Sequence, residues 1–562
     1  MKTIRVMALG GHGFFGRLLV ERLILQPGLE VVVAGRSAER GTALVAELGA
    51  RAAGSLAALT LDIDAPDLAC RLADARPDVV VHTVGPFQGQ DYRVAQACIA
   101  AGAHYIDLAD GRDFVTGIGV LDAAARLAGV AVISGASSVP ALSSAVADEL
   151  AQGLREIDRI DVGISPGNRT QRGLSTLRAV LGYCGRPLAV AGQAGVYGWC
   201  GHWRQAYPAP VGTRLLSPCD VPDLALLPGR YPGRPQVRFG AGLELPLLHR
   251  AMNVMGWLVR RGWVAGWDRY APALKRMSEW LLPWGSDAGA MHVRVEGHDH
   301  RQRPVVREWM LVAREGHGPS VPTLAAAALV ARLAAAQVLA PGARPCLGEL
   351  SSAEILAQAR GLSIEAGVAA LPELFEQAMA GGWRKLHPSV RAFHELHGSI
   401  DLIGRVEAPS GLLRALLAHG LRIPTRGGPL RVHLRHSRDE QVWTRQFPRG
   451  RLRSSLRPHA RGVAETLGPI RLVFALREEL GDLVMVLDSI RVWGLPWPTW
   501  LWPRLVARER GGEGRLQFEL RAELPLIGEI AGCRGWVDLP RQTIVAPAAD
   551  PRISAPSAGV LQ

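Results

Sequence analysis

Hydrophobic and polar positions follow two alternating periods over the first 153 residues. Apolar runs typical of buried strands lie at residues 4–9 and 31–33, and residues 17–26 between them have helical spacing that ends at Pro27 and Gly28. Further strands are predicted at residues 57–63, 78–82, 104–108 and 130–134, with helices at 65–75, 91–101, 121–127 and from Pro140 to about 152. This alternation predicts an α/β fold, a Rossmann-type doubly wound parallel sheet, over residues 1–153.

The pattern of hydrophobic and polar residues changes from about Asp158. Residues 160–164, 291–296 and 305–313 alternate like strands of a half-exposed antiparallel sheet. Between them, residues 248–284 are apolar and rich in Trp, which predicts two or three helices. The alternative for this segment is contact with a membrane interface. We therefore expect an α+β domain over residues 154–365.

Beyond about residue 371 the period-two alternation dominates. Six strands are predicted, at residues 430–436, 441–447, 470–476, 483–493, 515–524 and 527–537. With short turns between them, they describe a meander that curls round an apolar interior. Residues 371–545 are thus a β-rich domain, and the Pro-, Ala- and Ser-containing stretch 546–562 is expected to be a flexible tail.

A glycine turn follows the first strand directly. Gly is 64 of 562 residues, so a G-x-G-x-x-G match is weak alone, but this one lies between a strand and a helix. Such a turn lets backbone N–H groups meet a pyrophosphate, or it is a turn without a ligand. The residues assigned to it are Gly11, His12, Gly13, Phe14, Phe15 and Gly16.

Arg36 stands where an NAD enzyme would place an acidic residue against the ribose 2′-hydroxyl. It lies twenty residues beyond Gly16 and is followed by Ser37. A guanidinium group suits a 2′-phosphate, so the expected cofactor is NADP, with Arg36 and Ser37 among its contacts. The alternative is an ordinary surface arginine.

Composition limits the other classes of function. Hydrophobic residues at 48% and charged residues at 20% describe globular domains. The seven Cys contain no C-x-x-C pair, which favours a reducing compartment and no zinc site. No signal peptide is recognised, and the longest apolar stretch, 324–340, is interrupted by Arg332, so we expect no transmembrane segment and a cytoplasmic location.

The net charge of +13 is carried almost entirely by Arg, because Lys occurs only at positions 2, 275 and 385. Eleven Arg fall in residues 422–461 against Asp439 and Glu440. They suit phosphates or an anionic membrane surface, or they are the solvated faces of strands. Interleaved aromatics on a recognisable module are missing, so nucleic acid is not the expected partner.

Candidate proton donors lie at the carboxyl ends of the predicted parallel strands, beside the crevice where a cofactor binds. Tyr105 and Asp107 share a face of one strand and are the catalytic candidates, a donor with its orienting carboxylate; His82, Ser137 and Ser138 also qualify. Alternatively, Tyr105 is a core residue and Asp107 caps the next loop. His387, His394 and His397 are expected to be structural rather than metal-binding. His298 and His300, in a hairpin turn, are expected to be solvated at the surface.

Several motifs, in the correct order over residues 1 to about 365, resemble saccharopine-dehydrogenase-like reductases. They are the glycine turn, residues 34–37, 78–87, 97–108 and 323–336, and Gly348 with Glu349. The resemblance implies a Rossmann domain, then an α+β substrate and dimerisation domain, with a homodimer through its sheet. It also implies NADP, with Gly85 and Pro86 near the nicotinamide and Asp62 near the adenine.

The region after residue 371 resembles a bacterial domain of unknown function that is often fused to such reductases. The matching pieces are residues 386–388, 393–394, 443–447, 494–496 and 524–525.

Saccharopine, the substrate in the family's name, is not the substrate that we expect. The turn at residues 135–140 departs from the family pattern, and no dicarboxylate amino-acid site is recognisable. We therefore expect an NADP-dependent oxidoreductase that reduces a small, apolar or lipid-like acceptor, with peripheral membrane contact. The alternative is a non-catalytic NADP-binding scaffold whose C-terminal domain binds a hydrophobic ligand or a membrane surface.

Overall fold

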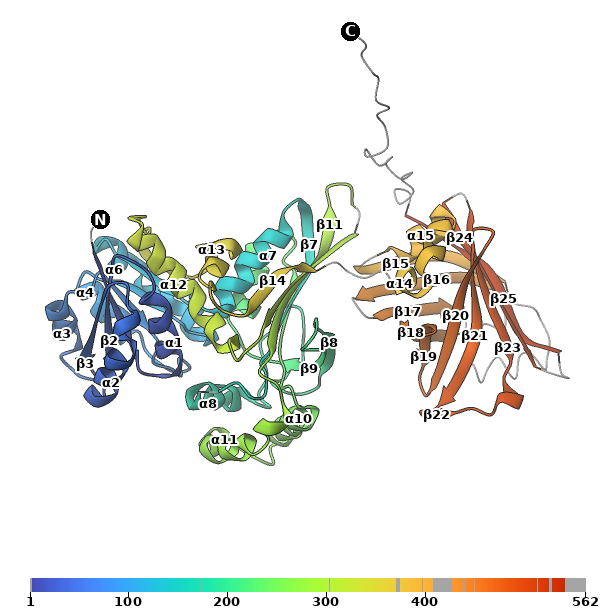
Figure 1. Cartoon of the computed structure of the whole chain (residues 1–562). Coiled ribbons are helices and arrows are strands. Elements are labelled where there is room, and N and C mark those ends of the chain that lie inside the picture. Colours follow the sequence, from blue (N-terminus) through green and yellow to red (C-terminus); the bar gives the residue numbers. More distant parts are fainter. Residues whose placement is uncertain are drawn as a thin grey trace, which may run out of the picture. The chain divides into compact units, whose positions relative to one another are not determined.

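The computed structural model describes most of the chain, which forms two compact units. The first is made of Met1–His300 and Arg307–Ala369, and the second holds the rest (Figure 1). The predicted tail from residue 546 lies outside the described residues. Those described are 3–171, 173–302, 304–369, 374–396, 398–407, 427–437, 440–448, 450–512, 514–524 and 528–540.

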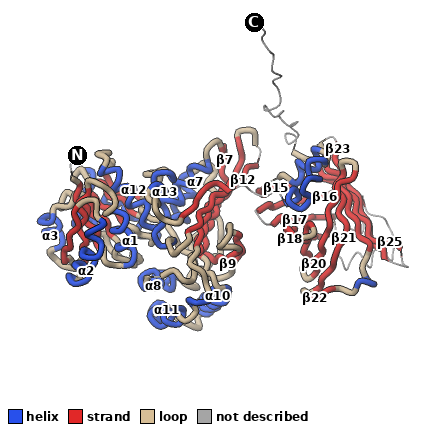
Figure 2. The backbone as a smooth tube through the Cα atoms, viewed as in Figure 1, coloured by secondary structure: helices blue, strands red, loops and turns tan. Residues whose placement is uncertain are grey.

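A parallel sheet in the order β13-β6-β5-β4-β1-β2-β3 organises the beginning of the first unit (Figure 2). Its strands are rich in Val and Ile because both faces are buried. The predicted Rossmann-type sheet is confirmed, except that its edge strand β13 comes from far along the chain. The strands are β1 (Ile4–Leu9), β2 (Leu29–Gly35), β3 (Ser55–Thr60), β4 (Val79–His82), β5 (His104–Asp107), β6 (Ala131–Ser134) and β13 (Gly342–Pro345).

Helices cover both faces of this sheet, and successive residues of β1 show the division. Val6 packs with Leu19 on one face, whereas Met7 packs with Leu72 on the other. The helix expected from Pro140 begins with an irregular turn, Ser138–Leu142, and becomes regular only at Ser143. The helices are α1 (Phe14–Leu23), α2 (Ala38–Leu48), α3 (Leu68–Ala75), α4 (Arg93–Ala100), α5 (Arg112–Gly117), α6 (Asp122–Leu127), α7 (Ser143–Ala151), α12 (Val321–Ala334) and α13 (Ser352–Ala357).

A second, mixed sheet follows, in the order β14-β12-β11-β7-β10-β9-β8. One face is apolar and packs on α7 through residues such as Val162 and Val293. The predicted strands at residues 160–164, 291–296 and 305–313 are confirmed, and β8, β9, β10 and β14 were not predicted. The strands are β7 (Leu154–Ser165), β8 (Trp203–Ala206), β9 (Thr213–Pro218), β10 (Gln236–Ala241), β11 (Gly289–Asp299), β12 (Pro304–Ala313) and β14 (Ile364–Ala369).

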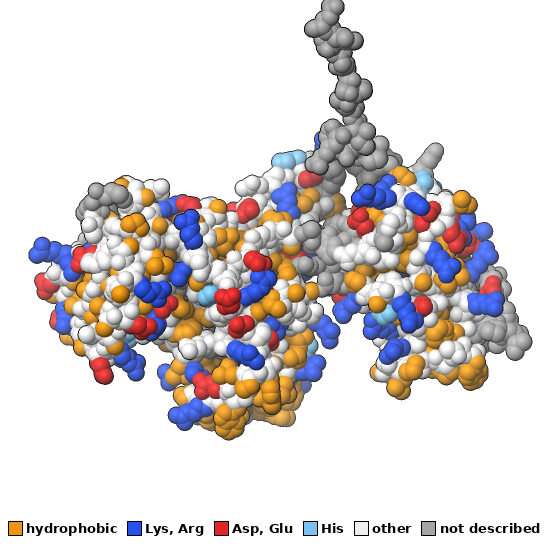
Figure 3. Space-filling view, in the orientation of Figure 1, with side chains coloured by type: hydrophobic (Ala, Val, Ile, Leu, Met, Phe, Trp, Pro, Cys, Tyr) orange, Lys and Arg blue, Asp and Glu red, His pale blue; other side chains and the backbone are white. Residues whose placement is uncertain are grey.

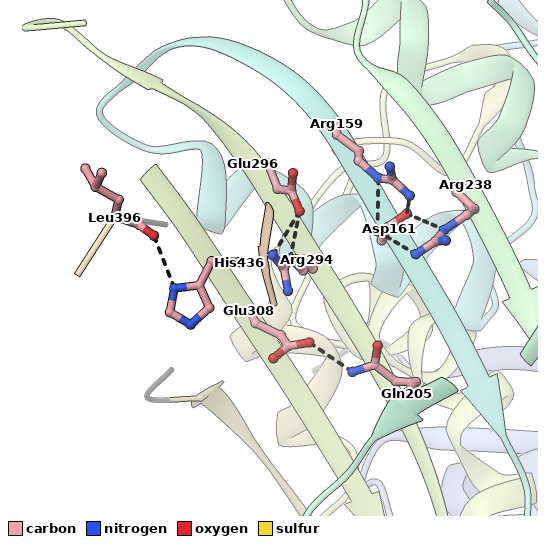
Figure 4. A network of polar contacts seen from close by, with 9 residues as sticks. All are labelled: Arg159, Asp161, Gln205, Arg238, Arg294, Glu296, Glu308, Leu396 and His436. Atoms are coloured by element: carbon pink, nitrogen blue, oxygen red, sulfur yellow. Dashed lines mark hydrogen bonds and ion pairs between the residues drawn. The ribbon is translucent and has the colours of Figure 1, made fainter. Parts of the chain in front are cut away.

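The other face of this sheet carries paired charges (Figure 4). Asp161 receives hydrogen bonds from Arg159 Nε at 3.1 Å and from Arg238 Nε at 2.7 Å. Burial raises the pKa of Asp161, but the two guanidinium groups outweigh it and bring the pKa to about 2. On the same sheet, His292 Nδ1 lies 2.9 Å from the Tyr207 hydroxyl, and burial lowers the pKa of His292 to about 3. We interpret these contacts as structural.

Helices also lie between strands of the second sheet along the sequence. They are α8 (Leu174–Tyr183), α9 (Asp223–Arg230), α10 (Pro246–Arg260) and α11 (Ala271–Glu279). The last two confirm the expectation of helices in residues 248–284. Among the described residues, no helix is both long enough and apolar enough to cross a bilayer.

The second unit is a closed barrel. Neighbouring strands pair in the order β20-β19-β18-β17-β16-β15-β25-β24-β23-β21, and β20 also pairs with β21, which closes the ring. The expected meander around an apolar interior is confirmed; β15, β18, β19, β22 and β23 were not predicted. The elements are α14 (Leu374–Met379), α15 (Pro388–His394), β15 (Gly398–Glu407), β16 (Gly428–Ser437), β17 (Glu440–Phe447), β18 (Gly450–His459), β19 (Gly462–Leu467), β20 (Ile470–Glu479), β21 (Asp482–Val492), β22 (Leu495–Pro496), β23 (Arg504–Gly512), β24 (Arg515–Leu524) and β25 (Gly528–Asp538).

Candidate dinucleotide site

The strand order of the first sheet reverses between β1 and β4, which places a crevice at the carboxyl ends of these strands. The residues that follow the two strands are in contact there. Both the amide and the hydroxyl of Thr83 donate to the Leu9 carbonyl, each at 2.9 Å. A Cβ added to Gly10 would lie 2.7 Å from Val84 Cγ2. The sequence reading had not singled out Gly10, whose φ of +84° suits glycine.

The glycine turn brings α1 directly against the end of β1. The Gly13 amide donates to the Gly10 carbonyl at 2.8 Å, and a Cβ on Gly16 would lie 2.1 Å from that same oxygen. Gly13 is exposed and caps α1 without a side chain, and the first turn contains no acidic residue. The first-turn amides of Phe14, Phe15 and Gly16 therefore form a cradle that fits a pyrophosphate.

His12 connects the glycine turn with the end of β2. A Cβ on Gly35 would lie 2.3 Å from His12 Nε2, so the imidazole occupies the space that only a glycine leaves open. Among the described residues, His12 Nε2 has no hydrogen-bond partner although it is buried. A polar ligand atom at this point would satisfy it.

Arg36 is exposed immediately beyond β2, at the start of α2. The Ser37 hydroxyl caps α2 by accepting the Arg40 amide at 3.3 Å. Arg40, which the sequence analysis missed, is also exposed in this first helical turn. A helix start flanked by two guanidinium groups fits the 2′-phosphate of NADP. The sequence feature that could have identified Arg40 is its place three positions after the serine that caps α2.

Asp62 and the Gly85–Pro86 turn lie after β3 and β4, as the sequence order requires. Asp62 is half-buried, and its Oδ1 accepts the Asp64 amide at 3.2 Å. Gln90, a residue not predicted, holds the 84–86 turn: its Nε2 donates to the Val84 carbonyl at 2.9 Å and the Pro86 carbonyl at 2.7 Å. Contacts of Asp62, Gly85 and Pro86 with a cofactor stay predictions.

Tyr105 and Asp107 are entirely buried. The Tyr105 hydroxyl lies 3.0 Å from His82 Nδ1, and burial holds the pKa of Tyr105 well above its usual value. Asp107 Oδ1 accepts the Ala109 amide at 2.9 Å and the Gly135 amide at 2.7 Å. These are the contacts of a core tyrosine and of a carboxylate that fixes two turns, and a role in proton transfer stays a prediction.

His82, Ser137 and Ser138, the other candidate donors, are buried as well. Burial lowers the pKa of His82 to about 3, so its imidazole is neutral in the folded protein. Burial also raises the pKa of Asp107, to about 6. Asp107 Oδ2 has no hydrogen-bond partner among the described residues.

A further buried carboxyl group, Asp223 on α9, was not predicted. The Ser143 hydroxyl at the start of α7 donates to its Oδ1, and within the described part of the chain its Oδ2 has no partner. Burial raises the pKa of Asp223 to about 7. The sequence offered no signal, because the burial comes from residues distant along the chain.

The start of α8 adjoins the glycine turn. Gly173 caps α8, and a Cβ on it would lie 3.8 Å from Phe14 Cδ1. The loop before it is fixed by Glu244, whose Oε2 accepts the amides of Asn168 at 2.6 Å and Ser286 at 2.9 Å. Gly173 therefore lies beside the start of α1, and Glu244 holds Asn168 and Ser286.

The predicted histidine groups have other partners. His387 caps α15, and His394 Nε2 lies 2.6 Å from Glu509 Oε2; His397 lies outside the described residues. His298 pairs with Asp158 at 3.0 Å. In the described ranges, no group of three or more His, Cys, Asp or Glu side chains is placed to hold a metal ion.

The arginine-rich segment lies mostly on β16–β18. Its residues 422–426 lie outside the described part of the chain, and Arg431, Arg451 and Arg453 are exposed. Arg457 pairs with Glu440 at 3.0 Å. Arg445 of the same segment lines the barrel cavity instead, so only part of the segment forms solvated strand faces.

Comparison with known proteins places these features in families. Residues 6–139 match the saccharopine dehydrogenase NADP binding domain, and residues 386–537 match a domain of unknown function, DUF4166. A Mycobacterium tuberculosis protein named as a trans-acting enoyl reductase is 38% identical over 104 residues, which cover 18% of this chain and 24% of that protein. The chain thus spans about a quarter of the length of this curated relative.

Two solved structures are similar at low identity. Apo saccharopine dehydrogenase (L-Glu forming) from Saccharomyces cerevisiae has 13% identity and a TM-score of 0.47, over 65% of this chain and 100% of that one. Amine dehydrogenase from Mycobacterium smegmatis has 12% identity and a TM-score of 0.35, over 61% of this chain and 94% of that one. By its two family matches, the chain joins an NADP-binding domain of the saccharopine dehydrogenase type to a DUF4166 domain.

Proposed function

We propose that the protein is an NADP-dependent reductase that acts on an apolar, lipid-like acceptor. The observation that carries the cofactor part is the glycine cradle on α1 together with the paired guanidinium groups of Arg36 and Arg40 at the start of α2. When bound, the reduced nicotinamide supplies a hydride, and a proton completes reduction of a polarised C=C or C=O bond. The name of the curated relative, an enoyl reductase, supports a C=C acceptor.

The apolar acceptor is supported by an exposed surface on α10, α11 and the turns beside them, which we term the tryptophan face. Figure 3 shows hydrophobic side chains gathered over these elements. Trp263, Trp280 and Trp284 are 69%, 79% and 72% exposed. The remaining exposed apolar members are Leu247, Val254, Trp257 and Met277.

Basic residues accompany this tryptophan face. Residues 246–284 contain Arg250, Arg260, Arg261, Arg269, Lys275 and Arg276 against Asp268 and Glu279. Exposed Trp beside an excess of positive charge is typical of helices that lie on anionic bilayers. We infer peripheral membrane contact here, which would give the reductase access to acceptors held in a lipid phase.

Proton transfer is assigned to Tyr105 with Asp107, at the carboxyl end of β5. The raised pKa of Tyr105 keeps its hydroxyl protonated, and the contact with His82 orients it. Asp107 fixes the Gly135 turn beside it. A homodimer through the second sheet and a cytoplasmic location complete the proposal as expectations of the family resemblance.

Titration of NADPH fluorescence with the full chain tests the cofactor. We expect saturable binding that Arg36→Ala and Arg40→Ala each weaken about tenfold, because each removes a charge-assisted contact with the phosphate. NADH binding should hardly change, and Arg51→Ala, an exposed arginine at the other end of α2, is the matched control. Binding of NADPH that is insensitive to Arg36 and Arg40 would contradict the proposal.

Vesicle flotation tests the tryptophan face. The protein should float with anionic vesicles but not with phosphatidylcholine alone, and Trp263→Ser with Trp280→Ser should abolish flotation. Leu127→Ser removes a 92% exposed leucine on α6 and is the control.

A non-catalytic NADP-binding scaffold is the second candidate, and the burial of Tyr105, Asp107 and His82 favours it. It predicts NADPH that binds but is never oxidised by α,β-unsaturated acyl thioesters or ketones. Steady loss of NADPH absorbance with either acceptor would exclude it.

A further inference from the structure

We infer that the barrel of the second unit binds a long-chain acyl molecule, with its chain in the apolar interior and an oxygen acceptor at Arg445. This inference concerns the DUF4166 domain alone, and it stands whether or not the first unit reduces a substrate.

The described strands of the barrel enclose a cavity of about 1400 Å³. Drug-sized pockets occupy roughly 300–1,000 Å³, and barrels of about eight strands already hold one small ligand. A ring of ten strands is wider, so side chains reaching inward from opposite walls leave space between them. The interior is therefore large enough for an elongated ligand.

Most of the cavity wall is apolar, with a few charged side chains. Residues directly opposite each other on paired strands share a face: Val432 on β16 lies opposite Arg445, Leu472 on β20 opposite Glu465, and Leu520 on β24 opposite Ala507. Water would find few polar partners along such a wall, whereas an acyl chain buries its surface there. Other lining residues are Leu430, Phe447, Leu452, Phe474, Met485, Leu487, Ile490, Leu505, Ala507 and Phe518.

Arg445 is the charged group best placed to select a ligand. It lies on the inner face of β17, with its guanidinium carbon 4.6 Å from the Trp443 ring centroid. Its Nη1 donates to Ser454 Oγ at 3.0 Å and to Glu465 Oε1 at 3.4 Å. Both contacts use one nitrogen, so Nε and Nη2 have no acceptor among the described residues and are available to a ligand oxygen.

Two carboxylates that line the cavity are already paired, Glu465 with Arg445 itself and Glu509 with a histidine. Glu509 on β23 contacts His394 of α15 at 2.6 Å, and both side chains are buried. Phe393, beside His394, packs on Trp443 with ring centroids 5.3 Å apart and lines the cavity. Helix α15 thus forms a floor beside Trp443, whose ring lies next to the Arg445 guanidinium group.

The end of the barrel opposite α15 has features typical of an entrance for lipids. Gly468 and Pro469 in the β19–β20 turn, with Trp497 and Pro503 after β21, line the cavity at this end. Next to them, Trp493 is 82% and Trp500 75% exposed. Exposed tryptophans at an opening suit transfer of an apolar ligand from a lipid phase.

Fluorescence titration of the full chain with cis-parinaric acid, a fluorescent long-chain fatty acid, tests the inference. We expect saturable binding that palmitate and methyl palmitate displace, because both supply an oxygen acceptor. Hexadecane, which has none, should compete about tenfold more weakly. Stronger competition by palmitate than by methyl palmitate would identify a free fatty acid, and stronger competition by methyl palmitate would identify an esterified chain.

Two neighbours on β23 provide a matched pair of variants. Ala507 lines the cavity, whereas Val506 points outward and is 38% exposed. Ala507→Phe should weaken probe binding at least about tenfold by filling the cavity, and Val506→Phe should leave it unchanged. The inference is overturned if the probe does not saturate, or if folded Ala507→Phe binds it like the parent.

If Ala507→Phe does not fold, Arg445→Met tests ligand binding in the barrel instead. It should weaken palmitate about tenfold and remove the advantage of palmitate over hexadecane. The control is Arg431→Met, an exposed arginine on neighbouring β16. Unchanged competition by palmitate in Arg445→Met would overturn the assignment of the acyl oxygen to Arg445.

Discussion

The imidazole of His12 fills the space above Gly35, where a Cβ would come within 2.3 Å of Nε2. This contact joins the glycine turn to the end of β2, just before Arg36, and so connects two parts of the proposed cofactor site. Gly35→Ala should displace the His12 ring and weaken NADPH binding about tenfold while the fold persists, because a side chain can move where a backbone cannot.

A double-mutant cycle checks this coupling by NADPH titration. In the His12→Ala background, Gly35→Ala should cost nothing further, since the ring it displaces is gone. Equal losses in both backgrounds would show that Gly35 acts independently of His12.

Gly13 is expected to matter for binding and not for folding. A Cβ there would meet only the Gly10 carbonyl, at 3.0 Å, but would project where the pyrophosphate approaches the first amides of α1. Gly13→Ala should weaken NADPH at least about tenfold with little change in melting temperature. Gly49→Ala, at an open position after α2, should change neither. A large loss of stability in Gly13→Ala would refute the distinction.

Tyr105→Phe separates a proton donor from a core residue. If Tyr105 donates, the variant should bind NADPH normally and turn over an unsaturated acyl thioester about a hundredfold more slowly. Tyr92→Phe is the control, because its hydroxyl donates to the Phe114 carbonyl at 2.9 Å and Tyr92 packs against the hydrophobic cluster that contains Tyr105. Equal turnover in both variants would leave Tyr105 with a packing role alone.

Asp223 should make the protein less stable as pH rises. Its folded pKa of about 7 lies above the unfolded value of about 4, so only the folded state holds the proton between these pH values; stability falls as pH rises through this window, and the loss is complete above pH 7. The loss is on the order of 4 kcal/mol. Asp223→Asn, which keeps an oxygen for Ser143, should be stabilised relative to the parent at pH 8 more than at pH 5.

Chemical denaturation at the two pH values measures this difference. Comparing variant with parent cancels the opposite contribution of His82 and His292, whose low pKa values remove stability as pH falls below 6.5. A variant that shows the parent's pH dependence would refute the assignment to Asp223.

The sequence predicted the parts of the fold that local patterns encode. Val31–Val33 and Val79–Val81 are apolar on both faces because parallel strands are covered twice, and such runs stand out. β13 escaped prediction because Gly342–Pro345 has no strand-like pattern and is a strand only through pairing with β6.

In the candidate site, too, some residues could be proposed from local sequence patterns and others could not. Arg36 could be predicted because its distance from the glycine turn is fixed by one β-α-β unit. Gln90 could not, because its role depends on a turn whose carbonyls it reaches only in the folded chain. The burial of Tyr105 and Asp223 depends on residues from several elements, so no local spacing predicts their pKa values.

The strand β13 also has a consequence for synthesis on the ribosome. The first sheet ends with Gly342–Pro345 beside β6, which ends at Ser134, so the edge of the nascent Rossmann layer stays uncovered until the chain has grown from residue 134 to residue 342. Until then β6 presents unpaired backbone groups, which favour association between chains. A fragment cut after residue 153 keeps that open edge permanently, and the cofactor layer is therefore a product of the whole first unit.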